Sequence, residues 1–319
     1  MVARVFIDGE AGTTGLRIRE RLECRADLQL LSIEPARRKD SAARRDCLND
    51  ADLVILCLPD AAAREAVTLI DNPMVKVIDA STAHRVAPGW AYGFPEMTKA
   101  QRAIVAGATW VSNPGCYPTG FIALVKPLVD EGLLPYTWPV TVNAVSGYSG
   151  GGRSMIAEFE DAASPDFTHA AYRIYATNLA HKHVAEMGLY TGLATAPLFT
   201  PAVGRFHQGM IVEIPLHLAA LPKTPKLADL HAVISAAYVN EPFVRVASLD
   251  ECAATVNLDP EKLNNTNRME LYVFGSDTIG QTRLVAVLDN LGKGASGAAV
   301  QNLNLMLGRP EGEGLGLPA

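Results

Sequence analysis

The first third of the chain alternates short apolar runs with amphipathic stretches. The apolar runs, rich in branched side chains, predict strands at Val2–Ile7, Leu28–Ile33, Asp52–Leu58 and Val75–Asp79. Between them, apolar residues recur every three or four positions, as at Ile18 and Leu22, which is typical of one face of a helix. This alternation predicts an α/β fold with βαβ units and a Rossmann-like, doubly wound parallel sheet.

A different pattern begins after the first third of the chain. Longer runs that alternate apolar and polar residues predict strands at Val140–Val145, Met210–Leu218, Met269–Phe274 and Thr282–Leu288. Such runs indicate a larger, mixed or antiparallel sheet, and therefore a second, α+β domain. The stretch 293–307 predicts a closing helix, and the Gly- and Pro-rich residues 309–319 predict a flexible tail.

Length and composition fit this division into two domains. A chain of 319 residues with 49% hydrophobic and 19% charged residues can form a large core, which excludes a disordered chain. Its 28 basic and 34 acidic residues give a net charge of −6, which offers no positive field for a nucleic acid. No apolar run resembles a signal peptide or approaches the ~20 residues of a membrane span. We therefore expect a cytoplasmic protein that binds neither nucleic acid nor membrane.

Three glycines lie between the first predicted strand and the first predicted helix. The string D-G-E-A-G-T-T-G, which starts at residue 8, has the spacing G-x-x-G-x-x-G. Glycine at such a turn lets backbone N–H groups approach a pyrophosphate at the positive end of the helix dipole. We assign a dinucleotide to this turn and to the residues Gly9, Gly12, Thr13, Thr14 and Gly15. The alternative is an ordinary tight turn between a strand and a helix.

The end of the second strand decides which dinucleotide fits, because a carboxylate there suits a ribose hydroxyl whereas arginines suit a 2′-phosphate. Glu34 stands 19 residues after Gly15. It is followed by the basic run Arg37, Arg38 and Lys39. Three cations beside one carboxylate favour a phosphate dianion, so Arg37 and Arg38 predict NADP(H) rather than NAD(H). The alternative is a solvated basic loop.

The strongest chemical signal is the string S-N-P-G-C-Y-P-T, in which Cys116 follows a Pro-Gly turn and precedes the apolar run Phe121–Val129. Cys116 is therefore expected at the N-terminus of a helix, where the dipole lowers a thiol pKa from about 8.5 toward neutrality. The resulting thiolate is a nucleophile for acyl chemistry. The alternative, a structural cysteine, better describes Cys24, Cys47, Cys57 and Cys252. The five cysteines show no C-x-x-C pair or zinc-site spacing, which favours a reducing compartment and no bound metal.

A thiol nucleophile needs a proton acceptor, and the chain offers two. In the string H-K-H-V-A-E, His183 lies three residues before Glu186, so on a helix the two share a face and the carboxylate can orient the ring. His181 would point elsewhere on that helix, which also counts against a metal-binding H-x-H pair. The rival is His207, in a glycine-flanked loop that enters a strand. The other histidines, His84, His169, His217 and His231, fit surface or internally satisfied positions.

Two further segments suit an anionic substrate. The glycine-rich loop 146–153 leads from a strand toward a helix, so its amides and Arg153 can hold an anion; the alternative is a flexible hinge. The segment 79–85 follows a predicted strand at the sheet edge where open α/β sheets bind ligands, so Arg85 is a candidate clamp for substrate or phosphate. The full substrate-binding set is Arg85, Asn113, Ser149, Gly150, Arg153 and His207. Ser81, in the same segment as Arg85, is assigned to the cofactor.

Taken together, these strings resemble N-acetyl-γ-glutamyl-phosphate reductase. The similarity runs from Gly9 to Asn302 and rests on the glycine turn, S-N-P-G-C-Y-P-T, H-K-H-x-x-E and the closing run D-N-L-G-K-G-A-S-G-A-A-V-Q-N at 289–302. The compact chain resembles the short type of this family. The long type has H-R-H-T-P-E where this chain has H-K-H-V-A-E.

The resemblance implies NADPH-dependent reduction of N-acetyl-γ-glutamyl phosphate to N-acetylglutamate 5-semialdehyde, with release of phosphate, as a step of arginine biosynthesis. A thioester on Cys116 fits this reaction, with His183 as the proton shuttle. The resemblance also returns the C-terminal helix to the nucleotide domain and places Asn290 close to the nicotinamide. We therefore expect a dinucleotide-binding domain at 1–115 completed by helix 290–308, a catalytic and dimerisation domain at 116–289, and a homo-oligomer, either a dimer or a tetramer.

Two other functions remain open from the residues alone. Another cysteine-based enzyme that acts on an acyl phosphate, such as an aspartate-semialdehyde dehydrogenase, shares the thiol and the dinucleotide domain but uses a different carboxylate clamp. A non-catalytic NADP-sensing protein would keep the glycine turn and carry an inert Cys116. Rapid, stoichiometric labelling of one thiol at neutral pH would argue against the sensor.

Overall fold

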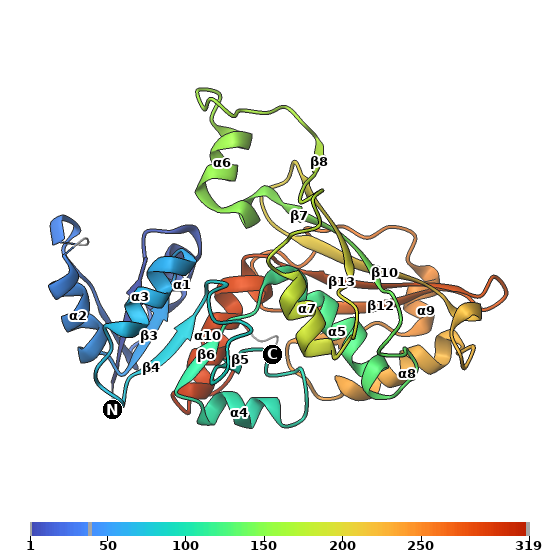
Figure 1. Ribbon diagram of the computed structural model, residues 1–319, viewed down its shortest axis with the longest axis horizontal. Coiled ribbons are helices and arrows are strands. Elements are labelled where there is room, and N and C mark those ends of the chain that lie inside the picture. Colours follow the sequence, from blue (N-terminus) through green and yellow to red (C-terminus); the bar gives the residue numbers. More distant parts are fainter. Residues whose placement is uncertain (1, 38–39, 317–319) are drawn as a thin grey trace. The chain divides into compact units, whose positions relative to one another are not determined.

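A computed structural model describes residues 2–37 and 40–316 of the chain (Figure 1). The contacts divide the chain into two compact units. Unit 1 comprises the residues up to Pro95, the segment Lys99–Pro114 and the C-terminal segment from Ala295. Unit 2 comprises Glu96–Thr98 and Gly115–Gly294. The chain thus passes from unit 1 to unit 2 directly before the turn that carries Cys116.

Unit 1 contains a six-stranded parallel sheet with the strand order β2-β1-β3-β4-β6-β5. Its strands are β1 (Ala3–Asp8), β2 (Leu28–Leu31), β3 (Leu53–Leu56), β4 (Lys76–Asp79), β5 (Ala91–Tyr92) and β6 (Trp110–Ser112). The first four occupy the segments that the apolar runs predict, so the doubly wound sheet is confirmed. Strands β2 and β3 pair with opposite edges of β1, which makes the carboxyl end of β1 the place where such sheets bind ligands.

Helices cover both faces of this sheet. They are α1 (Thr13–Leu22), α2 (Ser41–Asp50), α3 (Asp60–Thr68), α4 (Gln101–Gly107) and α10 (Gly297–Met306). On one face, Leu48 of α2 and Ala63 of α3 belong to the same core cluster as Phe6 of β1. Neighbouring strand residues point to the opposite face, where α10 packs against α1 and α4. The C-terminal helix therefore completes a three-layer unit that begins with the N-terminal strand.

The end of the chain is packed rather than frayed, so the predicted flexible tail over 309–319 is wrong for residues 309–316. Glu311 forms an ion pair with Arg102 at 2.8 Å, and Leu315 is buried. The Gly- and Pro-rich composition indicates turns correctly but carries no information about an ion pair between residues 209 positions apart. This tail therefore helps to fix α4 within unit 1.

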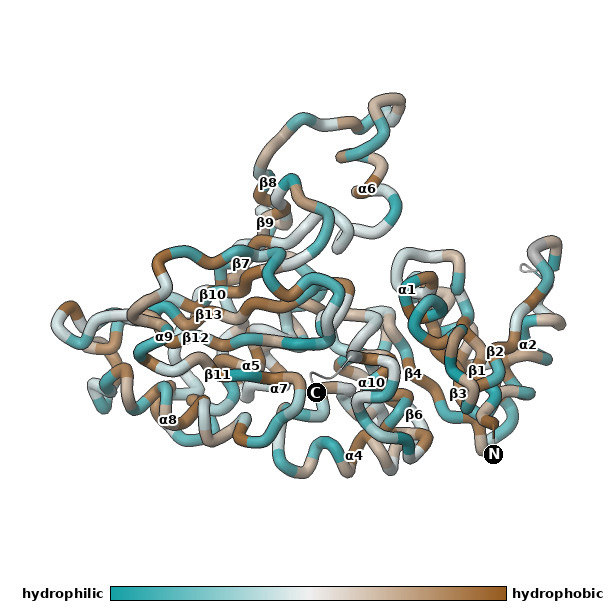
Figure 2. The backbone as a smooth tube through the Cα atoms, turned by 180° about the vertical axis from the view of Figure 1, so that it is seen from behind, coloured by the Kyte–Doolittle hydropathy of each residue, from teal (hydrophilic) through white to brown (hydrophobic). Residues whose placement is uncertain are grey.

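Unit 2 contains a seven-stranded mixed sheet with the order β11-β12-β13-β10-β7-β9-β8. Its strands are β7 (Thr141–Gly147), β8 (Tyr172–Ile174), β9 (Leu198–Gly204), β10 (Met210–His217), β11 (Val244–Val246), β12 (Met269–Ser276) and β13 (Gln281–Leu288). The pairs β7–β9 and β11–β12 are parallel and the others antiparallel, which confirms the mixed sheet of an α+β domain. Figure 2 shows apolar runs along β10 and β13 in the middle of this sheet.

Helix α5 (Cys116–Asp130) forms the centre of the unit 2 core. It packs on β10 and β13, and eleven of its fifteen residues are buried. Gly120 permits the close approach, because a Cβ there would lie 3.0 Å from Cγ2 of Val212. The remaining helices of unit 2 are α6 (Gly152–Glu160), α7 (Val184–Thr191), α8 (Leu227–Ala237) and α9 (Leu249–Ala254). Because α7 and α8 also pack against α5, this helix is held from several sides.

Candidate active site

The glycine turn of unit 1 joins β1 to α1 in the way the sequence predicts. Gly9 has a φ of +90°, and a Cβ at this position would lie 2.3 Å from the carbonyl oxygen of Cys57. A Cβ on Gly15 would lie 2.4 Å from the carbonyl oxygen of Gly9. Gly12 is the N-cap of α1, and no side chain caps its N–H groups. Thr13 and Thr14 form the first helical positions, so this end of α1 fits a pyrophosphate.

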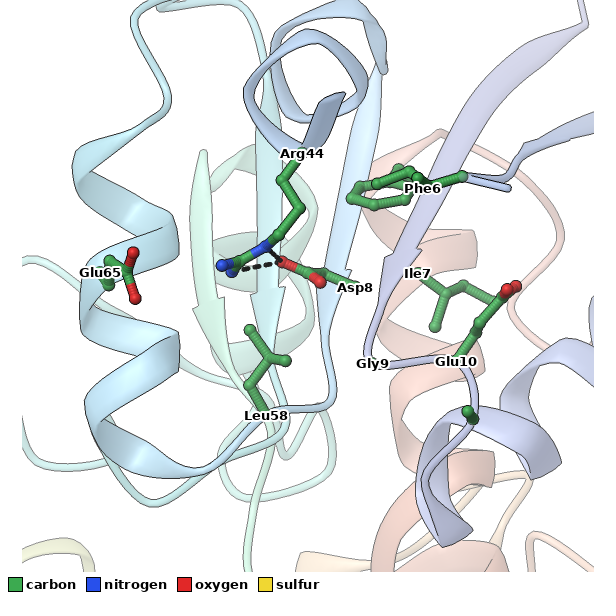
Figure 3. A pocket seen from close by; sticks show the side chains of 10 residues that line it. Phe6, Ile7, Asp8, Gly9, Glu10, Arg44, Leu58 and Glu65 are labelled. Atoms are coloured by element: carbon green, nitrogen blue, oxygen red, sulfur yellow. Dashed lines mark hydrogen bonds and ion pairs between the residues drawn. The ribbon is translucent and has the colours of Figure 1, made fainter. Parts of the chain in front are cut away.

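A pocket of about 430 Å³ lies beside the glycine turn in unit 1. Its lining comprises Phe6, Ile7, Asp8, Gly9, Glu10, Ala11, Ile33, Arg44, Leu58 and Glu65. In Figure 3 the guanidinium of Arg44 on α2 and the carboxylate of Asp8 at the end of β1 point toward each other. Both Nε and Nη2 of Arg44 donate to Oδ2 of Asp8, at 3.1 and 2.8 Å. Burial raises the pKa of Asp8, and Arg44 offsets part of that rise.

The cations that the sequence assigns to the cofactor lie differently. Arg37 ends a short 3-10 turn and donates to Oδ2 of Asp40 at 2.9 and 3.1 Å. Its side chain is 58% exposed and is not part of the pocket lining. Asp40 is the N-cap of α2, and the Arg37 side chain, together with the capping N–H groups, lowers its pKa. Arg38 lies outside the described residues.

The segment after β4 is built around a buried carboxylate, Asp79. Ser81 donates its O–H to Oδ2 of Asp79 and its N–H to Oδ1, both at 2.8 Å. The ring of His84 contacts the same carboxylate at 2.6 Å and stacks on Trp90, so the expectation of a satisfied histidine is confirmed here. Arg85 is also buried and donates to the carbonyl oxygen of Ala80 at 3.3 Å. The polar groups of this segment therefore shape the loop itself.

Asn113, which the sequence assigns to the substrate, joins three segments of unit 1. Its Nδ2 donates to the carbonyl oxygen of Ala295 at 2.9 Å. Its Oδ1 accepts from Nδ2 of Asn302 on α10 at 3.1 Å, and the same Asn302 amide donates to Gly93. Asn113 thus ties the strand before the cysteine turn to the C-terminal helix.

Cys116 is the first residue of α5, so the predicted position at a helix N-terminus is confirmed. Its N-cap is Gly115, and no side chain caps the helix. The cysteine is not part of a disulfide and is half-buried. In contrast, burial raises the pKa of the Cys57 thiol to about 12 and also raises the pKa of Cys47 and Cys252. Cys116 alone among these four combines a helix start with partial access to solvent.

The carboxylate of Glu186 lies beside the start of α5. It is almost fully buried, and its Oε2 accepts the backbone N–H of Gly115 at 3.1 Å. The sequence predicts that Glu186 orients His183 on a shared helix face. In the structure, α7 begins at Val184 and His183 is its N-cap, so the two lie at the helix start. Glu186 therefore fixes the amide that directly precedes the thiol-bearing residue.

Both histidines of the H-K-H string belong to one aromatic cluster. The rings of His181 and His183 have centroids 4.6 Å apart, and His181 Nδ1 accepts the backbone N–H of His183 at 3.1 Å. The prediction that His181 points elsewhere is wrong, because it assumed a helix at these positions. Tyr117, the residue after Cys116, lies 5.8 Å from the His183 ring and 6.1 Å from the His181 ring. The cluster thus surrounds the first turn of α5.

Two tyrosines that the sequence reasoning missed complete this cluster. Tyr175 donates its O–H to the hydroxyl of Tyr117 at 3.1 Å, and Tyr117 donates to the carbonyl oxygen of Ala202 at 3.3 Å. Burial raises the pKa of Tyr175 to about 12, and negative charge on Cys116 acts in the same direction. Tyr117 has a pKa well above its usual value for the same first cause. Both hydroxyls therefore remain protonated donors beside the thiol; the adjacency of Tyr117 to Cys116 was the only sequence signal.

The glycine-rich loop of unit 2 meets two other predicted residues. Asn290 donates from Nδ2 to Oγ of Ser149 at 3.1 Å and accepts the N–H of Gly209 at 2.7 Å. The backbone of His207 accepts from Ser149 at 3.0 Å. A Cβ on Gly150 would lie 3.5 Å from Nδ2 of Asn290. The structure therefore brings together four of the predicted residues, while Arg153 is exposed on the first turn of α6.

The turn after β13 packs against the nucleophile. A Cβ on Gly294 would lie 2.7 Å from Cβ of Cys116, so only glycine fits there. The predicted closing helix begins in this turn as a π-helical segment, Gly292–Ser296, before α10. Lys293, which the sequence reasoning missed, is fully buried and pairs with Glu96 at 2.7 Å. This ion pair joins the turn to the short segment Glu96–Thr98 of the same unit.

Two kinds of feature were looked for in the part of the chain that the structure describes. Within residues 2–37 and 40–316, no group of three or more His, Cys, Asp or Glu side chains is arranged to hold a metal ion. Among the helices of the described residues, none has the length and apolar character that a membrane span requires.

Comparison with known proteins defines the class. The NAD binding domain of semialdehyde dehydrogenases matches residues 4–105, and the dimerisation domain of the same enzymes matches residues 116–290. The chain therefore belongs to the semialdehyde dehydrogenase family. Curated relatives from Brucella suis and Brucella ovis, both called N-acetyl-gamma-glutamyl-phosphate reductase, are 54% identical over 97% of this chain and 100% of their own length. These relatives confirm the resemblance to that reductase.

Solved structures show the same fold at low sequence identity. Aspartate semialdehyde dehydrogenase II of Vibrio cholerae, complexed with ASA, has a TM-score of 0.68 and 15% identity over 96% of this chain and 98% of its own. A probable aspartate-semialdehyde dehydrogenase of Pseudomonas aeruginosa has a TM-score of 0.70 and 15% identity over 96% and 99%. The Candida albicans enzyme with NADP has a TM-score of 0.64 and 12% identity over 96% and 99%. At these identities the likeness concerns the fold alone.

Proposed function

We propose that this chain reduces N-acetyl-γ-glutamyl phosphate to N-acetylglutamate 5-semialdehyde with NADPH and releases phosphate, as a step of arginine biosynthesis. The observation that carries the proposal is the position of Cys116 as the first residue of α5, at a helix start without a side-chain cap, in a chain 54% identical to reductases of that name. A thiol in this position is suited to accept an acyl group from an acyl phosphate.

Cys116 acts as the nucleophile in this proposal. Its thiolate attacks the acyl carbon, a C–S bond forms, and the C–O bond to phosphate breaks with the electron pair leaving on phosphate. NADPH, when bound, supplies a hydride to acyl carbon. Release of the aldehyde breaks the C–S bond and returns the electron pair to sulfur. The protein must therefore ionise the thiol, hold the acyl group and accept the proton of the resting thiol.

The residues of the glycine turn are the ones we propose for the cofactor. Gly9 and Gly15 leave no room for a side chain, and the uncapped N–H groups from Thr13 onward suit the pyrophosphate. Ser81 remains in the set proposed for the cofactor. It lies in the loop at the carboxyl end of β4, and Asp79 accepts its hydroxyl hydrogen bond. Asn290 is proposed for the nicotinamide end on the basis of the resemblance.

His183 is the proton acceptor that the geometry favours over His207. The ring of His183 lies within the aromatic cluster of Tyr117, the residue after the nucleophile, and its helix partner Glu186 holds the amide before the nucleophile. The contacts of His207 are with the glycine-rich loop, through its backbone to Ser149 and its ring to Tyr148. We therefore assign proton transfer to His183 and binding of the substrate to His207.

The substrate is dianionic at its phosphate and carries one free carboxylate at its α-carbon. Ser149, Gly150 and Arg153 in unit 2 are proposed to bind it through amides and one cation. Arg85 and Asn113 in unit 1 are buried, and both hold loop backbone. We propose that these two shape the substrate site and that Arg153 supplies the exposed charge.

We further propose that the protein works in the cytoplasm as a homo-oligomer, a dimer or a tetramer, and binds neither nucleic acid nor membrane. The match of residues 116–290 to a dimerisation domain supports the oligomer. The net charge of −6 supports the absence of a nucleic-acid partner.

The reverse reaction tests the proposal. Purified protein is incubated with N-acetylglutamate 5-semialdehyde, phosphate and NADP⁺, and the absorbance of NADPH is followed. The proposal expects reduction of NADP⁺ that depends on phosphate and on Cys116, with a Cys116→Ser variant as the control. Reduction of NADP⁺ with aspartate semialdehyde but not with N-acetylglutamate 5-semialdehyde would instead assign the activity for which the structural neighbours are named. Binding of NADPH without turnover on either aldehyde would assign a sensor.

A further inference from the structure

The pocket beside the glycine turn contains an unbalanced set of charges. Asp8, Glu10 and Glu65 contribute three carboxylates, and Arg44 is the only cation among the described lining residues. Glu10 pairs with Arg19 of α1, outside the lining. In Figure 3, Glu65 faces the pocket from α3, across from Arg44. The described lining therefore offers a phosphate dianion a single guanidinium.

The position of the pocket identifies the part of a dinucleotide that it suits. Its walls come from the end of β1 at Asp8, from Ile33 just after β2 and from Leu58 just after β3. In doubly wound sheets, the adenosine ribose lies at the end of the second strand, where its 2′ position is recognised. The glycine turn that suits the pyrophosphate shares Gly9 with this pocket. The pocket thus suits the adenosine half of the cofactor.

Arg44 is held at this place by Asp8. The side chains of Arg44 and Asp8 are 14% and 9% exposed, so water screens the pair weakly. Nε and Nη2 both donate to one oxygen of Asp8, which fixes the plane of the guanidinium over the pocket. Arg45, the next residue, instead pairs with Asp71 and has a side chain that is 55% exposed. Neighbouring arginines of α2 therefore have different surroundings.

We propose that the Asp8–Arg44 pair sets the preference of this chain between NADPH and NADH. Arg44 binds the 2′-phosphate, and Asp8 both positions Arg44 and competes with the phosphate for it. This inference deepens the proposed function, because it takes NADPH as the cofactor. It assigns the selectivity to a residue of α2 that the basic run after β2 does not include.

The competition makes the two partners act in opposite directions. Loss of Arg44 removes a charge-assisted, bidentate contact to the 2′-phosphate, a group that NADH lacks. Neutral asparagine at position 8 keeps an acceptor for Arg44 and removes a negative charge that repels the phosphate. Substitution of Arg44 is therefore expected to weaken the binding of NADPH selectively. Substitution of Asp8 by asparagine is expected to strengthen the binding of NADPH.

Direct cofactor binding tests the inference without any turnover. Dissociation constants for NADPH and NADH are measured by titration calorimetry for the wild type, Arg44→Gln, Asp8→Asn, the double variant, and Arg45→Gln as the matched control. We expect Arg44→Gln to weaken NADPH by about tenfold or more and NADH by less than about threefold. Asp8→Asn is expected to tighten NADPH several-fold, and Arg45→Gln to change neither constant.

Three results would overturn the inference. They are equal losses of NADPH and NADH on substitution of Arg44, no change on that substitution, and a selective loss of NADPH only in Arg37→Gln/Arg38→Gln. If Arg44→Gln unfolds because the carboxylate of Asp8 is left without Arg44, the double variant removes that carboxylate charge. If Arg44→Gln and the double variant both unfold, an unchanged NADPH preference in Asp8→Asn overturns the inference. Failure of the proposed function has a different signature: wild-type protein that binds NADPH tightly but does not act on N-acetylglutamate 5-semialdehyde.

Discussion

Two helix starts in this protein use the same local device for different purposes. Helix α1 begins after Gly12 and helix α5 begins after Gly115, and the two N-caps have nearly the same backbone angles, φ −75° and ψ 166° against φ −72° and ψ 149°. Neither helix has a side-chain cap. Each therefore begins with N–H groups that no capping side chain accepts, at the positive end of its dipole.

The surroundings of the two starts differ. The start of α1 lies beside a pocket, and the chain there offers only glycine and threonine, so an outside anion can use the amides. The start of α5 carries a thiol as its first residue, and a buried carboxylate, Glu186, accepts the amide just before it. The first start thus suits an anionic ligand, and the second carries the residue that we propose as the nucleophile of the protein itself. The same backbone is specialised by what packs against it.

The largest expected effect comes from removing the thiol at the second helix start. Cys116→Ser is expected to lower turnover by at least ~10³-fold, because a hydroxyl is not ionised by a helix terminus. The dissociation constant for NADPH should change less than about twofold, since the glycine turn belongs to α1. Steady-state rates and calorimetry measure the two. A serine variant with a substantial part of wild-type activity would exclude a covalent mechanism.

Proton transfer gives the next largest effect. His183→Asn is expected to lower the rate by about 10²- to 10⁴-fold, because the amide keeps the shape of the ring but cannot accept the proton. The acidic limb of the pH–rate profile should move or disappear in this variant. His207→Asn is the matched control and should mainly raise KM. The roles of the two residues would be reversed if His207→Asn lowered kcat more than His183→Asn does and if His183→Asn kept a normal pH–rate profile.

The glycine turn can be tested within itself. Gly9→Ala is expected to destabilise the protein by about 1–3 kcal/mol and to weaken both cofactors, because φ is +90° and the new Cβ would meet the Cys57 carbonyl. Gly12→Ala has an ordinary φ and a nearest contact at 3.3 Å, so it should cost about 1 kcal/mol at most. Thermal unfolding compares the two. Equal costs would show that the close approach of Gly9 to Cys57 does not restrict this turn.

Glu186 tests what the buried carboxylate does at the start of α5. Glu186→Ala is expected to cost about 1–3 kcal/mol of stability, because it leaves the buried N–H of Gly115 without its acceptor. Glu186→Gln keeps an oxygen acceptor and should retain most of that stability, with a smaller loss of rate than His183→Asn. Denaturant unfolding and kcat are the measurements. A glutamine variant as unstable as the alanine variant would mean that charge, rather than the hydrogen bond, is what Glu186 supplies.

The smallest effect is expected at Tyr175. Tyr175→Phe should change turnover by less than about tenfold near neutral pH, because its hydroxyl stays protonated and donates one hydrogen bond to Tyr117. The raised pKa of about 12 means that the folded state favours the protonated form over an unfolded value near 10. The contribution of Tyr175 to the stability of the folded state is therefore present below pH ~10 and is lost as pH rises toward 12. The phenylalanine variant should therefore lose less stability than wild type over this range in alkaline unfolding experiments.

The features that sequence predicts here depend on neighbours along the chain. Strand periodicity, the glycine turn and the position of Cys116 at a helix start follow from residues within one or two turns of each other, and the structure confirms them. The resemblance, which adds information from many sequences, identified the family that the relatives confirm.

The features that sequence does not predict depend on contacts between distant segments. Arg44 meets Asp8 across 36 residues, and Tyr175 meets Tyr117 across 58. No periodicity marks either pair. The error at His181 has a different cause. Helix geometry was applied to His181, but α7 begins only at Val184, so the rule that residues two apart point in different directions does not hold there. The packed tail was missed for the same reason as Arg44.

The central claim is that Cys116 forms an acyl-enzyme, and mass spectrometry tests it most directly. The protein is mixed with N-acetyl-γ-glutamyl phosphate without NADPH, quenched in acid and digested, while phosphate release is measured in parallel. The account predicts one equivalent of phosphate released per site and an N-acetylglutamyl group on the peptide that contains Cys116. Phosphate release only in the presence of NADPH, or an acyl group on another residue, would contradict it.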